Sequence, residues 1–224
     1  MTRDDYREKL KDLRQNVLYM SDLVCDRLRK SMKALEERDD DLAWEVIEGD
    51  SEVNDLYLDL EQDCIDLLAL QQPVAGDLRL IAASFKIITD LERIGDLAVN
   101  LADYSVDAEK HIFPEVNIQV LADDVFEMVE DSMEAYENED VELCYEVSER
   151  DESIDEECDQ INQRVIRELI EKEHEMSDDE VDTLLREVSR LLLTVRDLER
   201  VGDHSVNIAA RTLYMVENDD ELIW

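Results

Sequence analysis

The chain has 224 residues, of which 62 are Asp or Glu and 23 are Lys or Arg, giving a formal net charge of −39 at pH 7. A surface with this charge repels phosphate groups, which argues against binding to nucleic acid or to anionic lipid. The 44% hydrophobic content is too high for a disordered acidic protein, and few Gly, Pro and aromatic residues favour helix over strand. We therefore expect an all-α protein whose acidic coat suits a halophilic, high-salt cytoplasm.

The first part of the chain predicts two long helices. Hydrophobic residues at steps of three and four indicate an amphipathic helix over residues 4–38. The run 39–41 consists of aspartates, which favour helix N-termini, and marks a tight joint. A second helix is expected over residues 42–70, softly broken near Gly49.

A third helix is expected to complete a bundle. Pro73 and Gly76 end the second helix, and Asp77 is placed to cap the next one, which covers residues 78–102 and extends beyond them. Helices of this length joined by short turns pack antiparallel, so the three form a bundle.

After Pro114 the same order of elements returns. Periodic hydrophobic residues predict a fourth helix over residues 120–138 and a fifth over residues 141–173. Ser177 with Glu180 three residues later is a capping box, which starts the sixth helix. The chain is thus predicted to contain six long helices as two tandem three-helix bundles related by pseudo-twofold symmetry, over residues 1–112 and 113–224.

The strongest evidence for duplication is a thirteen-residue motif that occurs twice, at residues 90–102 and 197–209. Both copies contain Asp-Leu-Glu-Arg, a glycine and a second aspartate, followed by a valine, an asparagine and an alanine. Gly95 and Gly202 lie inside predicted helices, where glycine costs about 1 kcal/mol relative to alanine. Such a cost suggests that a facing helix approaches closely at these positions.

The motif also carries acidic and amide side chains four residues apart, which places them along one helix face. The preceding helix of each repeat carries one further pair of side chains with this spacing. Facing helices with such side chains form an oxygen-rich pocket suited to a hard cation such as Mg, Mn, Ca or iron. The candidate metal ligands are Asp50, Asn54, Glu92, Asp96 and Asn100 in the first repeat, and Asp151, Asp155, Glu199, Asp203 and Asn207 in the second.

Other interpretations of these residues remain open. In a chain this acidic, two acids four residues apart are common by chance and form a solvated face. Arg93 and Arg200 could neutralise the acids or pair with Asp90 and Asp197 on neighbouring turns. His204 is expected to be a surface or packing residue, and the isolated His111 and His174 receive no role.

Several classes of site are not expected. Cys25, Cys64, Cys144 and Cys158 show no close pairing and fall at helical positions, which predicts buried, reduced thiols. The polar N-terminus and the absence of a long uncharged run predict a cytoplasmic protein without direct membrane insertion. The sequence has no nucleophile–base pair and no phosphate loop, so we do not expect an enzyme.

The duplicated motif, preceded by Pro-Val-Ala-Gly-Asp-Leu-Arg at residues 73–79, resembles the PhoU family over nearly the whole chain. This resemblance implies two three-helix bundles and multinuclear metal sites built from E/D-x-x-x-D pairs. It also implies a homodimeric negative regulator of phosphate uptake. Such a protein acts with the phosphate ABC transporter through its ATPase subunit and, in bacteria, engages a sensor kinase.

By this resemblance, the first metal site uses Asp50, Asn54, Glu92 and Asp96, and the second uses Asp151, Asp155, Glu199 and Asp203. The first is expected to bind metal more weakly, because Asn54 replaces an acid. The cation is iron, manganese or magnesium.

Two alternatives belong to other classes. A ferritin-like, carboxylate-bridged iron protein needs two Glu-x-x-His elements, and only Glu171 with His174 offers one. A structural helical bundle without metal is the other.

Overall fold

The computed structural model describes residues 3–70, 74–106, 117–172 and 177–223, and in these residues every regular element is a helix. This confirms the all-α prediction. The helices are α1 (Arg3–Glu37), α2 (Asp40–Glu48), α3 (Asp50–Leu70), α4 (Ala75–Ser105), α5 (Ile118–Asn138), α6 (Val141–Lys172) and α7 (Asp178–Glu217).

The two repeats use the same joint after their first helix. Arg38 ends α1 and Glu139 ends α5, both with the left-handed backbone that closes many helix C-termini. The aspartate that follows each, Asp39 or Asp140, accepts a hydrogen bond from a backbone N–H in the first turn of the next helix. These matching joints turn the chain back on itself and start an antiparallel partner for the first helix.

The second predicted helix is divided in two at Gly49, as its composition suggested. The Arg27 side chain of α1 is almost fully buried and donates to the Gly49 carbonyl oxygen, and it also reaches Glu52 at 3.2 Å. A Cβ at position 49 would lie 3.0 Å from the Glu45 carbonyl oxygen, which is shorter than an ordinary van der Waals contact. The Glu52 backbone N–H also donates to the Gly49 carbonyl oxygen at 3.1 Å, so this carbonyl is paired where α2 ends and α3 begins.

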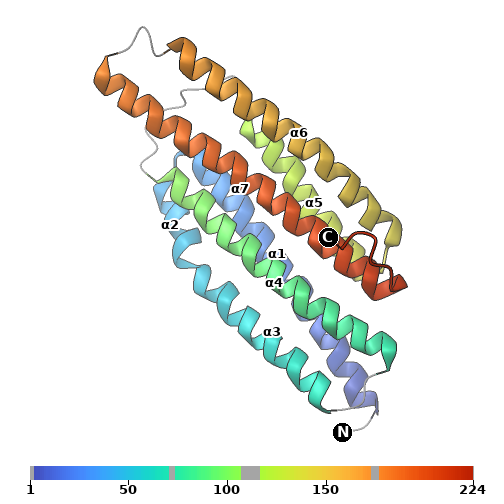
Figure 1. Ribbon diagram of the computed structural model, residues 1–224. Coiled ribbons are helices and arrows are strands. Elements are labelled where there is room, and N and C mark those ends of the chain that lie inside the picture. Colours follow the sequence, from blue (N-terminus) through green and yellow to red (C-terminus); the bar gives the residue numbers. More distant parts are fainter. Residues whose placement is uncertain (1–2, 71–73, 107–116, 173–176, 224) are drawn as a thin grey trace.

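Two three-helix bundles form, confirming the predicted architecture. The first contains α1, α2 with α3, and α4, and the second contains α5, α6 and α7. The long helices α4 and α7 lie side by side and antiparallel in the middle of the molecule (Figure 1). A single cluster of buried hydrophobic residues extends through both bundles, so the two repeats share one core.

The predicted helix boundaries hold with two corrections around the start of α4. Gly76 does not end the second helix, because α3 ends at Leu70 and Gly76 lies in the first turn of α4. Helix α4 begins at Ala75 after Val74, so Asp77 does not cap it and instead lies in its first turn, where a carboxylate still favours the helix dipole. Pro73, Pro114, His111, His174 and the expected boundary between residues 112 and 113 lie outside the described residues. The four cysteines are buried and free, as predicted. In the described ranges no helix has the length and apolarity needed to cross a membrane.

Candidate metal centre

In the second repeat, four predicted ligands come from two packed helices. Asp151 and Asp155 lie one turn apart on α6, and Glu199 and Asp203 lie one turn apart on α7. Gly202 lets the helices approach here, since a Cβ at this position would lie only 3.3 Å from the Asp151 Oδ1 atom. The glycine in the motif thus leaves room for a carboxylate, as the sequence indicated.

The four carboxylates repel one another in a partly dry environment. Burial, followed by the charges of Asp155, Asp203 and Glu199, raises the pKa of Asp151 to about 6. Burial and neighbouring acids also raise the pKa of Asp155 and of Glu199. Among the described residues no lysine, arginine or histidine forms an ion pair with any of the four. The second cluster therefore holds negative charge without an internal counter-charge.

One atom of the second cluster has no partner. The Asp151 Oδ1 atom is buried and makes no hydrogen bond. A buried acceptor without a donor costs roughly 1–3 kcal/mol, more when it is charged, and such atoms are rare in folded proteins. A cation bound beside Asp151 would satisfy this oxygen. The donor set, which consists of carboxylate oxygens, suits a hard cation.

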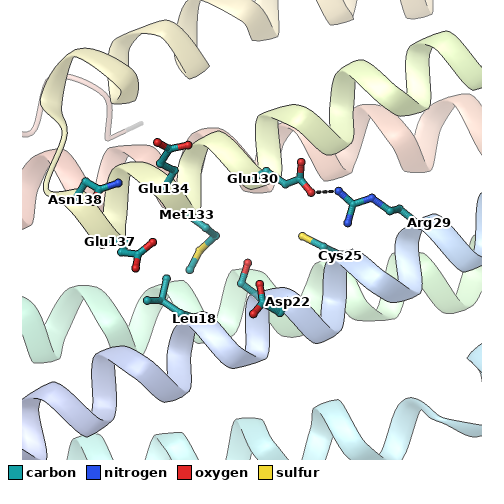
Figure 2. A pocket seen from close by; sticks show the side chains of 10 residues that line it. Leu18, Asp22, Cys25, Arg29, Glu130, Met133, Glu134, Glu137 and Asn138 are labelled. Atoms are coloured by element: carbon teal, nitrogen blue, oxygen red, sulfur yellow. Dashed lines mark hydrogen bonds and ion pairs between the residues drawn. The ribbon is translucent and has the colours of Figure 1, made fainter.

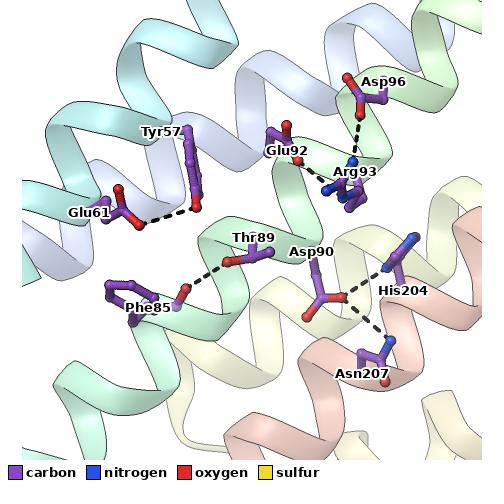
Figure 3. Close-up of polar contacts among 10 residues, drawn as sticks. All are labelled: Tyr57, Glu61, Phe85, Thr89, Asp90, Glu92, Arg93, Asp96, His204 and Asn207. Carbon is purple, nitrogen blue, oxygen red and sulfur yellow. Dashed lines mark hydrogen bonds and ion pairs between the residues drawn. The ribbon is translucent and has the colours of Figure 1, made fainter.

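The first repeat has the same positions with different surroundings. The Asn54 side chain donates to Asp50 Oδ2 at 2.7 Å, so this carboxylate already has a partner. Arg93 lies 3.4 Å from Glu92 and 3.3 Å from Asp96, so it neutralises part of the cluster, as one alternative held (Figure 3). Burial and Asp96 raise the pKa of Glu92, whereas Arg93 lowers it. This cluster is largely satisfied by the protein's own side chains.

Arg200, the equivalent arginine of the second repeat, points away from the second acidic cluster. Arg200 lies 3.8 Å from Asp197, the first residue of the second motif, and Arg196 contacts the same carboxylate at 2.7 Å. Asp197 is fully buried and also accepts a hydrogen bond of 2.9 Å from Tyr104 of α4. Asp197 thus uses its charge to connect α7 with α4, and it leaves the second acidic cluster without an arginine.

Each copy of the motif contains one predicted asparagine ligand, Asn100 or Asn207, and these two side chains have different neighbours from the acids. Asn207 donates to Asp90 Oδ1 on α4 at 3.4 Å, and His204 Nδ1 lies 2.9 Å from the same atom (Figure 3). Both side chains therefore contribute to the contact between the two bundles, and His204 is a packing histidine. Asn100 is half-buried on α4, one turn beyond Asp96.

As the side chains lie, no three His, Cys, Asp or Glu residues of the described ranges converge closely enough to hold a metal ion. In each repeat the predicted acids thus lie close enough to raise one another's pKa, but their side chains are not arranged to coordinate a metal. Metal binding at these residues stays a prediction.

The sequence interpretation missed other polar residues near the cluster. Asp159, one turn beyond Asp155, raises the pKa of both Asp155 and Glu199. The sequence indicates this residue, because Asp159 is a third acid at the same four-residue spacing after Asp151 and Asp155. Tyr104 and Arg196 had no such signal, because their contact with Asp197 depends on how the bundles pack.

The fold and these side chains define a class of protein: a tandem-repeat helical bundle with an acidic cluster in each half. The sequence profile of the PhoU domain matches residues 17–105 and residues 118–212. This chain belongs to the PhoU family.

Relatives match over almost the full length. The chain is 33% identical over 219 residues to a phosphate-specific transport system accessory protein PhoU homolog of Clostridium acetobutylicum, with 96% of each chain covered. It is 32% identical to PhoU homolog 1 of Methanothermobacter thermautotrophicus, with 94% of each covered. The crystal structure of PhoU from Pseudomonas aeruginosa superposes with a TM-score of 0.88 at 28% identity, covering 96% of this chain and 100% of that one.

Proposed function

We propose that this protein is an accessory protein of a phosphate-specific transport system and a negative regulator of phosphate uptake. The observation that supports this most is the match of both repeats to the PhoU domain, together with full-length similarity to relatives named as accessory proteins of that system. The proposed partner is the ATPase subunit of the phosphate ABC transporter, and a sensor kinase is a second candidate. The proposal places the protein in the cytoplasm as a homodimer without catalytic activity.

The proposal includes a metal at the second acidic cluster. Asp151, Asp155, Glu199 and Asp203 would hold an iron, manganese or magnesium ion, and the buried, unpartnered Asp151 Oδ1 atom supports this assignment. When bound, the cation supplies positive charge that offsets the repulsion among the carboxylates. With a cation bound, the carboxylates would tie α6 to α7, the helix that packs on α4 of the other bundle.

The two clusters are proposed to differ in affinity. In the first, Asn54 already donates to Asp50, and Arg93 already pairs with Glu92 and Asp96. A cation there would compete with a guanidinium group that is part of the chain. We therefore propose one strong and one weak metal site in each protein molecule.

The regulatory role is tested by co-purification of the tagged, full-length chain with the transporter ATPase from cells grown in high or low phosphate. We expect the ATPase to be retained, with the retained amount depending on phosphate supply. Cells that lack the chain should take up more phosphate than cells with it. Unchanged uptake together with no retention of the ATPase would refute the regulatory role.

The ferritin-like alternative makes a different prediction. If the chain stored or oxidised iron, anaerobic loading with ferrous iron followed by oxygen would give turnover, whereas a regulator would hold the iron without turnover. The chain's single Glu-x-x-His element, Glu171 with His174, has its histidine outside the described residues.

A further inference from the structure

The line of contact between α4 and α7 carries cationic side chains from both helices. On α4, Lys86 and Arg93 are seven residues apart, or two helical turns, so they lie on one side of the helix. Arg79, two turns before Lys86, shows that this side is turned toward α7, because it donates to the Met215 carbonyl oxygen at 3.1 Å. We call this line of contact the α4–α7 seam.

Helix α7 brings two further cations to the seam. Arg200 is equivalent to Arg93 in the second copy of the motif. Arg211 lies one turn after Asn207, whose side chain crosses the seam to Asp90 of α4 (Figure 3). The four side chains, which we call the seam cations, are Lys86, Arg93, Arg200 and Arg211.

The acids that lie in the seam are already paired. The largely buried Asp90 lies 2.9 Å from His204 Nδ1 and also accepts from Asn207. Asp197 is fully buried and accepts from Tyr104. The other acids of the two motifs belong to the acidic clusters, on the sides of α4 and α7 that are turned toward α3 and α6. The seam therefore exposes more positive than negative charge.

Lys86 and Arg211 lie across the seam from each other without a counter-charge. The contact of Asp90 with Asn207 fixes the register of the two antiparallel helices. One turn along from this contact, in the same direction, come Lys86 on α4 and Arg211 on α7, so the two lie at the same level. Among the residues that the structure describes, neither side chain forms an ion pair or a hydrogen bond, although the chain has 62 acidic residues for 23 Lys and Arg. Facing cations repel, and an anionic group between them offsets this repulsion.

The other contact between the first helices of the two repeats has the opposite charge. The groove between α1 and α5 is lined by Asp22, Glu130, Glu134 and Glu137, among others (Figure 2). Arg29 also lies in this lining, and it bonds to Glu130. Cationic side chains are thus a feature of the α4–α7 seam and not of every place where the repeats meet.

We propose that the α4–α7 seam is the docking site for an acidic segment of a partner protein, whose Asp or Glu side chains pair with the seam cations. Arg200 and Arg211 are about 16 Å apart along α7, and Lys86 and Arg93 are about 10 Å apart along α4. One small anion cannot span these distances, whereas a segment with several carboxylates can. The inference does not depend on metal binding or on the role in phosphate transport, so its test is separate from theirs.

The test uses the full-length chain and a fluorescent synthetic peptide of about three helical turns that carries glutamate at every second position. Binding is measured by anisotropy in about 0.5 M potassium chloride, which screens the general repulsion between the peptide and the acidic chain. Because the chain as a whole repels an acidic peptide, saturable binding indicates a local cationic site. A carbodiimide, which joins a lysine amine to a carboxylate in contact with it, then locates the peptide. We expect the cross-link at Lys86 and none at Lys11 or Lys33, which are exposed on α1.

Matched variants separate the seam from the total charge of the chain. The double variant Lys86→Gln, Arg211→Gln should weaken binding about tenfold, which corresponds to the loss of two ion pairs. The control double variant Arg7→Gln, Lys11→Gln removes the same charge from exposed positions on α1 and should change binding less than about twofold. The variant Lys86→Arg, Arg211→Lys keeps both charges and should retain most of the binding.

Four outcomes would overturn the proposal. One is the absence of saturable peptide binding by the unmodified chain. Equal weakening by the two charge-removing variants would assign the binding to net charge alone. Cross-links centred on the lysines of α1 would place the peptide elsewhere. Saturable binding of inorganic phosphate that is lost in Lys86→Gln, Arg211→Gln, with no peptide bound, would identify a small anion as the occupant.

Discussion

Asp151 and Asp50 occupy the same position in the two repeats, but their carboxylates have different surroundings. Asp50 accepts a hydrogen bond from Asn54, whereas the buried Oδ1 atom of Asp151 accepts none. Their position and spacing could be predicted from the duplicated sequence. The difference in charge between the two clusters could not be predicted, because it depends on the direction of one arginine side chain. Arg93 turns toward the acids of the first cluster, whereas Arg200 turns away from those of the second and contacts Asp197.

The raised pKa of Asp151 predicts how the metal-free protein responds to pH. Its pKa rises from 3.8 to about 6 on folding, so within this window the folded chain binds more protons than the unfolded chain. The contribution of Asp151 to the free energy of unfolding therefore falls as the pH increases from about 4 to about 6.

We expect Asp151→Asn to flatten this fall and to stabilise the metal-free protein by about 1 kcal/mol at pH 7, after allowance for solvent screening. Urea unfolding across this pH range in the presence of a chelator measures the effect. The exposed Asp123→Asn serves as a control and should leave the slope unchanged. Equal slopes for Asp151→Asn and the unmodified chain would contradict the assigned pKa.

At the scale of elements, local signals predicted most helix boundaries. Apolar periodicity, the aspartate joints and the capping box at Ser177 and Glu180 correspond to observed ends, and the Glu180 carboxylate accepts from the Ser177 backbone N–H at 2.9 Å. The start of α4 was misplaced because Val74 precedes the helix without a side-chain cap, so the nearest aspartate was the wrong guide.

The motif glycines allow a paired test of helix approach. A Cβ at position 202 would lie 3.3 Å from Asp151 Oδ1, and one at position 95 would lie 3.3 Å from Val53 Cγ1. Alanine favours the helix by up to about 1 kcal/mol in each case. We expect Gly202→Ala to displace the Asp151 carboxylate and reduce metal affinity, whereas Gly95→Ala leaves the strong site intact.

Thermal unfolding with and without manganese compares these two glycine variants. Stabilisation by the metal should be smaller in Gly202→Ala than in the unmodified chain and unchanged in Gly95→Ala. The same loss of metal stabilisation in both variants would show that the glycines act on helix packing in general.

At the scale of the whole molecule, the shared core was not visible in the sequence. The duplication predicted two bundles, but the contacts that join them, such as Ser84 with Tyr136 and Tyr104 with Asp197, connect residues far apart in the chain. Because one hydrophobic cluster extends through both repeats, we expect a single cooperative unfolding transition. Scanning calorimetry that resolves two transitions would contradict this.

The charge of −39 predicts a strong dependence of stability on salt. Screening shortens from about 10 Å at 0.1 M salt to about 3 Å at 1 M, which reduces repulsion among surface carboxylates. We expect the urea midpoint of the full chain to rise over this range in potassium chloride. A neutral osmolyte at equal osmolality is the control, and a midpoint that is constant in salt would count against the halophilic interpretation.

We propose that the acidic cluster of α6 and α7 holds a metal, whereas its counterpart on α3 and α4 is largely satisfied by the protein's own side chains. Calorimetric titration of the chelator-treated, full-length chain with manganese tests it most directly, on three forms: the unmodified chain, Glu199→Gln with Asp203→Asn, and Glu92→Gln with Asp96→Asn. We predict one tight site in the unmodified chain, its loss in the α7 variant and its retention in the α4 variant. No tight binding by the unmodified chain, or equal loss in both variants, would contradict the account.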